Sequence, residues 1–191
     1  MKQSAPFPRL KRMNQKANFT RSDIGRTLLS GLLILSVLLL IALRLTRSRK
    51  KMITRLYNYF VNVKGLAPEQ ARTLICQSAH ETDFWRSSVF EHSNNCYGIK
   101  GHKRKVTGKL ETLYKGYATY TNIEGSCNDI VDLLRRRYNI EAAHNIYLYV
   151  GALKEKGYFE DTLKNYLNGV LHAYKKIFPE SWHKYNTGGN E

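Results

Sequence analysis

One glutamate, Glu81, stands at the end of an apolar helical pattern. Apolar and small residues recur at intervals of three and four from Ala71 to Ala79, a spacing typical of one helix face. Phe84 and Trp85 follow shortly after. Apolar surroundings and the negative end of a helix dipole both raise a carboxyl pKa, so such a group can stay protonated near neutral pH and act as a general acid. Spacing alone favours the alternative, a polar residue at a helix end.

Three further motifs follow Glu81 in the chain. They read Asn-Asn-Cys-Tyr-Gly-Ile-Lys-Gly at 94–101, Tyr-Ala-Thr-Tyr-Thr-Asn-Ile-Glu-Gly-Ser at 117–126, and Ala-Leu-Lys-Glu-Lys-Gly-Tyr at 152–158 with Asn165-Tyr166 beyond. Together with Ser78, Glu81 and Trp85, they resemble in order the motifs of the glucosaminidase family of peptidoglycan hydrolases, glycoside hydrolase family 73. Four ordered matches over roughly residues 56–178 are more specific than any one motif.

The first motif departs from the family pattern. Where the family has Ser-Gly-Trp-Gly after the glutamate, this chain has Thr82-Asp-Phe-Trp85. The aromatic residue is displaced by one position and both glycines are missing, so the turn after the helix must be built differently. The chain also carries extra residues between Tyr158 and Tyr166, and either tyrosine can correspond to the family's site tyrosine.

The resemblance implies a lysozyme-like fold, with the acid on a helix that faces a cleft. It implies cleavage of the β-1,4 bond after N-acetylglucosamine, with Glu81 protonating the glycosidic oxygen. Glycosidases generally place a second carboxylate about 5–9.5 Å from the acid, and Glu111 is the expected one. The alternatives are that Glu111 is a solvated hairpin charge, or that the substrate's own acetamido group takes the second role.

Aromatic rings and asparagines in these motifs suit a sugar-binding site. Rings stack on sugar rings, and asparagine side chains fix loops through backbone hydrogen bonds. We expect substrate contacts from Trp85, Asn95, Tyr97, Tyr120, Tyr158 and Tyr166. Core packing is the alternative for Trp85 and Tyr97, and a loop-fixing role through backbone hydrogen bonds is the favoured alternative for Asn95. No metal or cofactor is expected, because the histidines and the cysteines Cys76, Cys96 and Cys127 lack ligand spacing, and three free thiols are the favoured interpretation.

The positive charge is concentrated near the N-terminus. The formal net charge is +16, of which residues 1–55 contribute +12 and residues 56–191 contribute only +4. A nucleic-acid binder needs a basic folded face, so we expect no nucleic-acid partner. Anionic lipid headgroups account for the basic residues instead.

Residues 27–43 form an uncharged, apolar run of 17 residues between two arginines. At about 1.5 Å per residue the run spans roughly 25 Å, close to the hydrocarbon core of a bilayer. The sequence therefore predicts a transmembrane helix at 27–44. A cleaved signal peptide is disfavoured by the basic segment that follows, and a buried core helix by the apolar character of all faces.

The remaining patterns predict an α+β fold dominated by helix. Helical patterns around 56–63 and 68–81 precede a Gly- and Tyr-rich stretch at 94–120, which suits a small antiparallel hairpin, and three more helical stretches follow. The expected segments are a basic disordered tail (1–26), the transmembrane helix (27–44), a basic linker (45–55), the lysozyme-like catalytic domain with its small β lobe (56–180) and a flexible C-terminal tail (181–191).

Together these features predict a membrane-anchored hydrolase of peptidoglycan glycan strands. Lys and Arg flank the apolar run on both sides, so charge does not set its orientation. A wall substrate requires the domain to face the periplasm or cell wall. The alternatives are a lytic transglycosylase or muramidase of the same fold, a noncatalytic wall-binding protein, and a phage protein in a virion membrane.

Overall fold

The computed structural model describes residues 21–101 and 106–183, with side chains from residue 28 onward. Residues 1–20 and 184–191 of the two expected tails lie outside this range. Residues 21–26 of the first expected tail are helical, and Ser181 of the second belongs to a 3-10 turn. The chain divides into two units, Met1–Leu45 and Thr46–Glu191, and each is described by itself.

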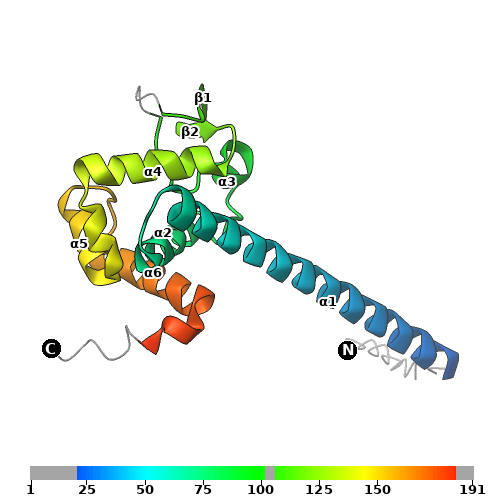
Figure 1. Cartoon of the computed structure of the whole chain (residues 1–191). Coiled ribbons are helices and arrows are strands. Elements are labelled where there is room, and N and C mark those ends of the chain that lie inside the picture. Colours follow the sequence, from blue (N-terminus) through cyan, green and yellow to red (C-terminus); the bar gives the residue numbers. More distant parts are fainter. Residues whose placement is uncertain (1–20, 102–105, 184–191) are drawn as a thin grey trace, which may run out of the picture. The chain divides into compact units, whose positions relative to one another are not determined.

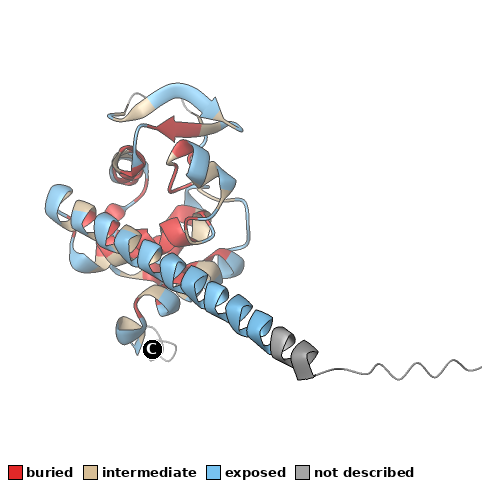
Figure 2. Cartoon of the chain, turned by 90° about the vertical axis from the view of Figure 1, so that its right-hand side faces the viewer, coloured by how far each residue is buried: buried red, intermediate tan, exposed pale blue. Residues whose placement is uncertain are grey.

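Helix α1 runs without interruption from Arg21 to Asn58 (Figure 1). It is therefore helical throughout the stretch 45–55, which the sequence predicts as a linker and which contains no glycine or proline. In the first unit its large apolar side chains are exposed (Figure 2). By length and composition this helix can cross a membrane, and a signal sequence has the same character.

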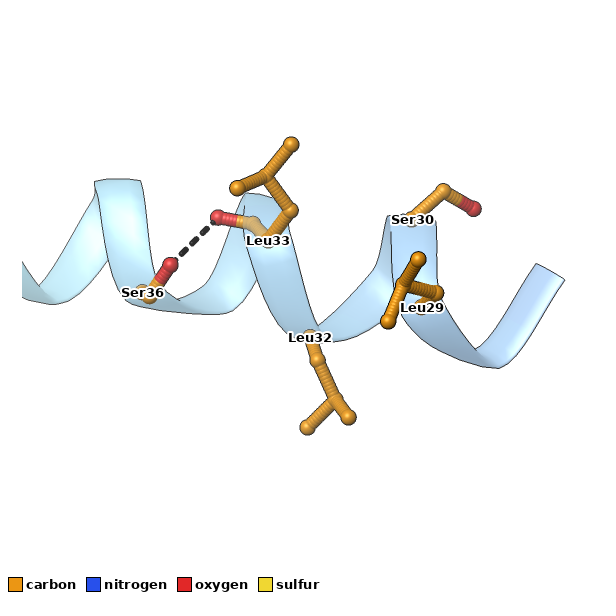
Figure 3. A pocket seen from close by; sticks show the side chains of 5 residues that line it. All are labelled: Leu29, Ser30, Leu32, Leu33 and Ser36. Atoms are coloured by element: carbon orange, nitrogen blue, oxygen red, sulfur yellow. Dashed lines mark hydrogen bonds between the residues drawn. The ribbon is translucent and has the colours of Figure 1, made fainter. Parts of the chain in front are cut away.

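One polar side chain in the apolar part of α1, Ser36, forms its hydrogen bond within the helix. The Ser36 hydroxyl donates to the Leu33 carbonyl oxygen at 2.8 Å, while Leu29 and Leu32 project outward (Figure 3). Such a bond lets a serine lie in an apolar environment without an unpaired hydroxyl. This arrangement is compatible with contact with lipid.

The second unit is mainly helical with one small sheet, as predicted. Its elements in chain order are the π-helical turn Tyr59–Val63, α2 (Pro68–Glu81), α3 (Ser88–Ser93), β1 (Lys109–Tyr114), β2 (Tyr117–Tyr120), α4 (Ile123–Arg137), a 3-10 turn (Ile140–His144), α5 (Ile146–Glu155), α6 (Leu163–Ile177) and a final 3-10 turn (Pro179–Ser181). The described cysteines Cys76, Cys96 and Cys127 are buried and unbridged.

Helix α2 lies in the core and carries Glu81 at its end. Pro68 occupies the first turn, where its fixed φ suits a helix start. The buried Gln70 side chain accepts a hydrogen bond from the Ala67 N–H at 2.9 Å and donates to the Ile140 carbonyl at 3.4 Å. Helices α5 and α6 complete the packing, and α2 packs directly against α6. The position of Glu81 is therefore fixed by a buried helix.

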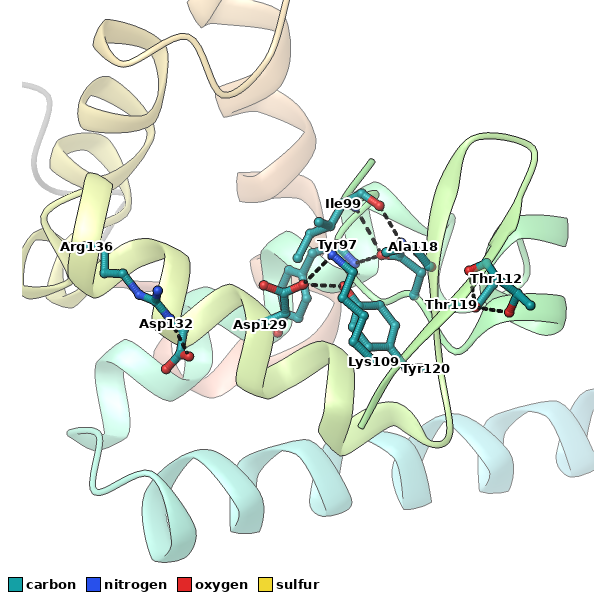
Figure 4. A network of polar contacts seen from close by, with 11 residues as sticks. Tyr97, Ile99, Lys109, Thr112, Ala118, Thr119, Tyr120, Asp129, Asp132 and Arg136 are labelled. Atoms are coloured by element: carbon teal, nitrogen blue, oxygen red, sulfur yellow. Dashed lines mark hydrogen bonds and ion pairs between the residues drawn. The ribbon is translucent and has the colours of Figure 1, made fainter. Parts of the chain in front are cut away.

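The predicted hairpin is confirmed as an antiparallel pair of strands, β1 and β2. Lys115 and Gly116 connect them with φ of 51° and 81°, as a type I′ turn requires. The buried side chain of Asp129 on α4 ties both strands down (Figure 4): its Oδ2 accepts from the Tyr120 hydroxyl at 2.8 Å and lies 3.6 Å from the Lys109 ammonium. Helix α4 thus holds the hairpin in place.

Candidate active site

Glu81 faces a cleft of about 510 Å³. The loop Tyr97–Lys100 forms one wall, the end of α4 with Arg137 and Tyr138 another, and the segment Gly157–Glu160 a third. The cleft combines aromatic side chains, two cationic groups and two carboxylates. A site of this composition suits a polar chain with ring faces, such as a glycan.

The Glu81 carboxyl group is suited to proton donation. Burial raises its pKa from an ordinary value of 4.5 to about 7, while a hydrogen bond from Tyr166 partly opposes this rise. The Tyr166 hydroxyl donates to Glu81 Oε1 at 2.5 Å. A carboxyl with a pKa near 7 retains its proton in a large fraction of molecules at neutral pH, which general-acid catalysis requires.

Gln77 and Tyr149 extend the contacts of Tyr166 into the core. The Gln77 amide nitrogen donates to the Tyr166 oxygen at 3.2 Å, and the Tyr149 hydroxyl donates to the Gln77 amide oxygen at 2.5 Å. Phe159 stacks on the Tyr166 ring with 3.8 Å between ring centroids. Tyr166 is thereby held from two sides.

The turn after Glu81 contains no glycine and is built from three consecutive residues at positive φ. Asp83, Phe84 and Trp85 adopt φ of 48°, 54° and 61° in succession, a conformation that costs non-glycine residues about 1–2 kcal/mol each. The Thr82 hydroxyl accepts from the Trp85 N–H at 3.0 Å, and the Trp85 indole donates to the Ser78 hydroxyl at 2.9 Å. These bonds bury Trp85 against α2, and it does not line the cleft.

The loop Asn94–Lys100 brings backbone close to the acid. Gly98 has a φ of 61°, and a Cβ atom there would lie 3.4 Å from Glu81 Oε2. Asn95 is fully buried: its amide donates to the Ile99 and Ala118 carbonyls at 2.8 and 2.9 Å and accepts from the backbone of Tyr97 and Ile99. The side chain of Asn95 therefore shapes the loop.

The predicted tyrosines lie in different places. Tyr97 and Tyr158 line the cleft, and the Tyr158 hydroxyl donates to the Tyr97 carbonyl at 2.9 Å. Tyr166 contacts Glu81 directly. Tyr120 is buried, and its hydroxyl donates to Asp129 Oδ2. The structure thus brings three of the four predicted tyrosines to Glu81 or its cleft.

The two carboxylates Glu111 and Glu160 differ in position. Glu111 is exposed on β1 and is not part of the cleft wall, whereas Glu160 lines the cleft together with Glu81. Sequence reasoning missed Glu160, as well as Gln77 and Tyr149. Gln77 stands four residues before Glu81 and so shares its helix face, but only the tertiary structure brings Tyr149 to it.

In the described part of the chain, no group of three or more His, Cys, Asp or Glu side chains is arranged to hold a metal ion. His80 instead packs edge-on against the Tyr166 ring, with 4.8 Å between ring centroids. Burial lowers the pKa of His80, so this side chain is a neutral packing element at neutral pH.

Comparison with known proteins gives one match. The family model described as "Glucosaminidase: Mannosyl-glycoprotein endo-beta-N-acetylglucosaminidase" matches residues 65–178, a range that includes Glu81 and every wall of the cleft. Comparison with curated proteins gives no match, and comparison with solved structures gives none either.

Proposed function

Because this chain belongs to the glucosaminidase family of glycoside hydrolases, with a lysozyme-like domain, we propose that it hydrolyses the β-1,4 bond after N-acetylglucosamine in peptidoglycan, with Glu81 as the general acid. One observation carries the role of Glu81. Its carboxyl group lies in the cleft with a pKa raised by burial to about 7. The family description, an endo-beta-N-acetylglucosaminidase, supports a glycosidic bond as the bond that this acid would cleave.

In this proposal the Glu81 proton passes to the glycosidic oxygen as the bond from that oxygen to C1 breaks. The departing sugar leaves as an alcohol, and water supplies the hydroxyl group at C1 and a proton that restores the acid. The positive charge that develops at C1 is stabilised by a second group, either a carboxylate or the acetamido group of the substrate itself. We propose Glu111 for this role, because the family resemblance implies a second carboxylate from the β lobe. Glu160 is its competitor, because Glu160 lines the cleft whereas Glu111 does not.

The proposed site of action is outside the cytoplasm, at the cell wall. Helix α1 is long and apolar enough to anchor the domain in the membrane, and the basic residues that flank its apolar part can bind lipid headgroups. The substrate requires the catalytic unit to lie on the wall side. Protease treatment of spheroplasts should then remove residues beyond about 55, whereas protection of the domain would contradict this orientation.

Mass analysis of digested sacculi tests the reaction itself. The full-length protein should release fragments whose new reducing ends are N-acetylglucosamine. Reducing ends of N-acetylmuramic acid would instead assign a muramidase, and anhydro-muramic ends would assign a lytic transglycosylase. A mannosyl-glycoprotein, the substrate named in the family description, should remain uncut.

A further inference from the structure

Four side chains form a buried hydrogen-bonded chain that ends on the acid. The order is Tyr149, Gln77, Tyr166 and Glu81, with successive donor–acceptor distances of 2.5, 3.2 and 2.5 Å. The Tyr149 and Tyr166 rings and the Gln77 amide are buried in the core. The members therefore exchange hydrogen bonds with one another in the absence of bulk water.

Such a chain has two possible directions of donation. In the forward direction each member donates toward Glu81. In the reverse direction Glu81 Oε1 carries the proton and donates to Tyr166, the Gln77 amide is flipped, and its nitrogen donates to the Tyr149 oxygen. Both directions satisfy the three links between the four groups, and they differ only at the two ends.

Burial of Tyr149 selects the forward direction. Its side chain is fully buried, and Gln77 is the only hydrogen-bond partner of its hydroxyl among the described residues. In the reverse direction the Tyr149 hydrogen would point into the core without an acceptor. An unsatisfied buried donor disfavours that state by about five-fold to a hundred-fold.

The forward direction decides which carboxyl oxygen of Glu81 carries the acid proton. Oε1 already accepts from Tyr166, so the proton resides on Oε2. Oε2 is the oxygen nearest to Gly98 in the cleft, at 3.4 Å from where a Cβ atom would stand. After proton transfer, the ionised carboxylate keeps the same hydrogen bond, and no member of the chain has to reorient.

We propose that Gln77 and Tyr149 are positioning residues that fix the direction of this chain and so hold the Glu81 proton on the cleft-facing oxygen. This inference rests on the proposed role of Glu81 as the acid. Without the Tyr149 hydroxyl, the forward direction leaves the Gln77 amide oxygen without its donor and the reverse direction leaves the amide nitrogen without its acceptor, so the two directions come closer in free energy. Only the protonated acid can adopt the reverse direction. The protonated form gains stability, and its proton spends time on the buried oxygen.

The test is the pH profile of kcat/KM on isolated peptidoglycan for full-length Tyr149→Phe and Gln77→Met. Both variants should lower kcat by about three-fold to twenty-fold, the size of a lost buried hydrogen bond, and should move the alkaline limb to higher pH. The double variant should add little to Gln77→Met, because both changes break the same chain. Substrate KM should stay unchanged.

A matched control comes from the other end of the same helix. The Tyr174 hydroxyl donates to Glu69 Oε1 at 2.8 Å. Tyr174→Phe therefore removes a tyrosine hydroxyl, as Tyr149→Phe does, but from a hydrogen bond that does not lead to Glu81. Its alkaline limb should coincide with that of the unaltered protein. A loss of folded protein would lower the amplitude of the profile in any variant, without moving its limb.

Failure of this inference is distinguishable from failure of the proposed function. If Glu81→Gln retains activity, the acid assignment and the inference both fall. If Glu81→Gln is inactive while Tyr149→Phe and Gln77→Met keep the original kcat and alkaline limb, only the positioning role is overturned.

Discussion

Replacing Glu81 with Gln should stabilise the protein at alkaline pH. Burial raises the pKa of this carboxyl from 4.5 to about 7, and one pKa unit corresponds to about 1.4 kcal/mol. Ionising Glu81 therefore costs the fold up to about 3 kcal/mol, an upper limit because the side chain is partly exposed. Gln keeps the acceptor for Tyr166 and carries no charge, so it avoids this cost.

The sign follows from proton linkage. Between about pH 4.5 and 7 the native protein holds the Glu81 proton more tightly than the unfolded chain does, so the contribution of this group to stability falls as pH rises. The stabilising contribution of the Glu81 proton is fully present below about pH 4.5 and is lost above about pH 7. The free energy of unfolding of Glu81→Gln, minus that of the unaltered protein, should therefore increase as the pH rises from about 4.5 to 7.

Urea unfolding of both proteins in detergent, followed by circular dichroism at pH 4.5 and 8.5, measures this difference. The free energies of unfolding, compared as variant minus unaltered protein, should be about 2–3 kcal/mol larger at pH 8.5 than at pH 4.5. Other titrating groups cancel in the comparison. An equal difference at both pH values would refute the buried, proton-holding state of Glu81.

Four further substitutions test separate parts of the account. Gly98→Ala should cost about 1–2 kcal/mol of stability at this positive φ. Movement of the loop beside Glu81 Oε2 to relieve that strain should lower kcat/KM by up to about a hundred-fold; an unchanged kcat/KM would contradict a role for the position of this loop in catalysis. Asp129→Asn should lower the free energy of unfolding by about 3–5 kcal/mol, since it removes the buried negative charge that lies 3.6 Å from the Lys109 ammonium; thermal melts that coincide with those of the unaltered protein would contradict this. Of the two carboxylates, Glu111→Gln should reduce kcat more than Glu160→Gln, and the opposite order would transfer the second role to Glu160.

The sequence predicts those features that depend on neighbours along the chain. The period of apolar residues before Glu81 gives helix α2 and places the acid at its end. The short alternations and the Gly- and Tyr-rich composition of residues 94–120 predict the hairpin, and the uninterrupted apolar run predicts the exposed part of α1. In each case local chemistry and the final fold favour the same structure.

Features that depend on contacts between residues far apart in the sequence could not be predicted from these local patterns. Asn95 and Trp85 suit sugar binding by residue type, yet backbone carbonyls occupy the amide of Asn95 and the Ser78 hydroxyl holds the indole of Trp85. The partnership of Gln77 with Tyr149 joins residues 72 positions apart. No spacing rule reports such a pair, because only the packing of α5 against the core creates it.

The most direct test of the central claim is the rate at which full-length Glu81→Gln releases reducing ends from isolated peptidoglycan, compared with the unaltered protein at pH 6. Loss of a general acid should lower this rate by about a hundred-fold to ten-thousand-fold, while circular dichroism shows an unchanged fold. A folded Glu81→Gln variant that works within about three-fold of the unaltered rate would contradict the assignment of Glu81 as the catalytic acid.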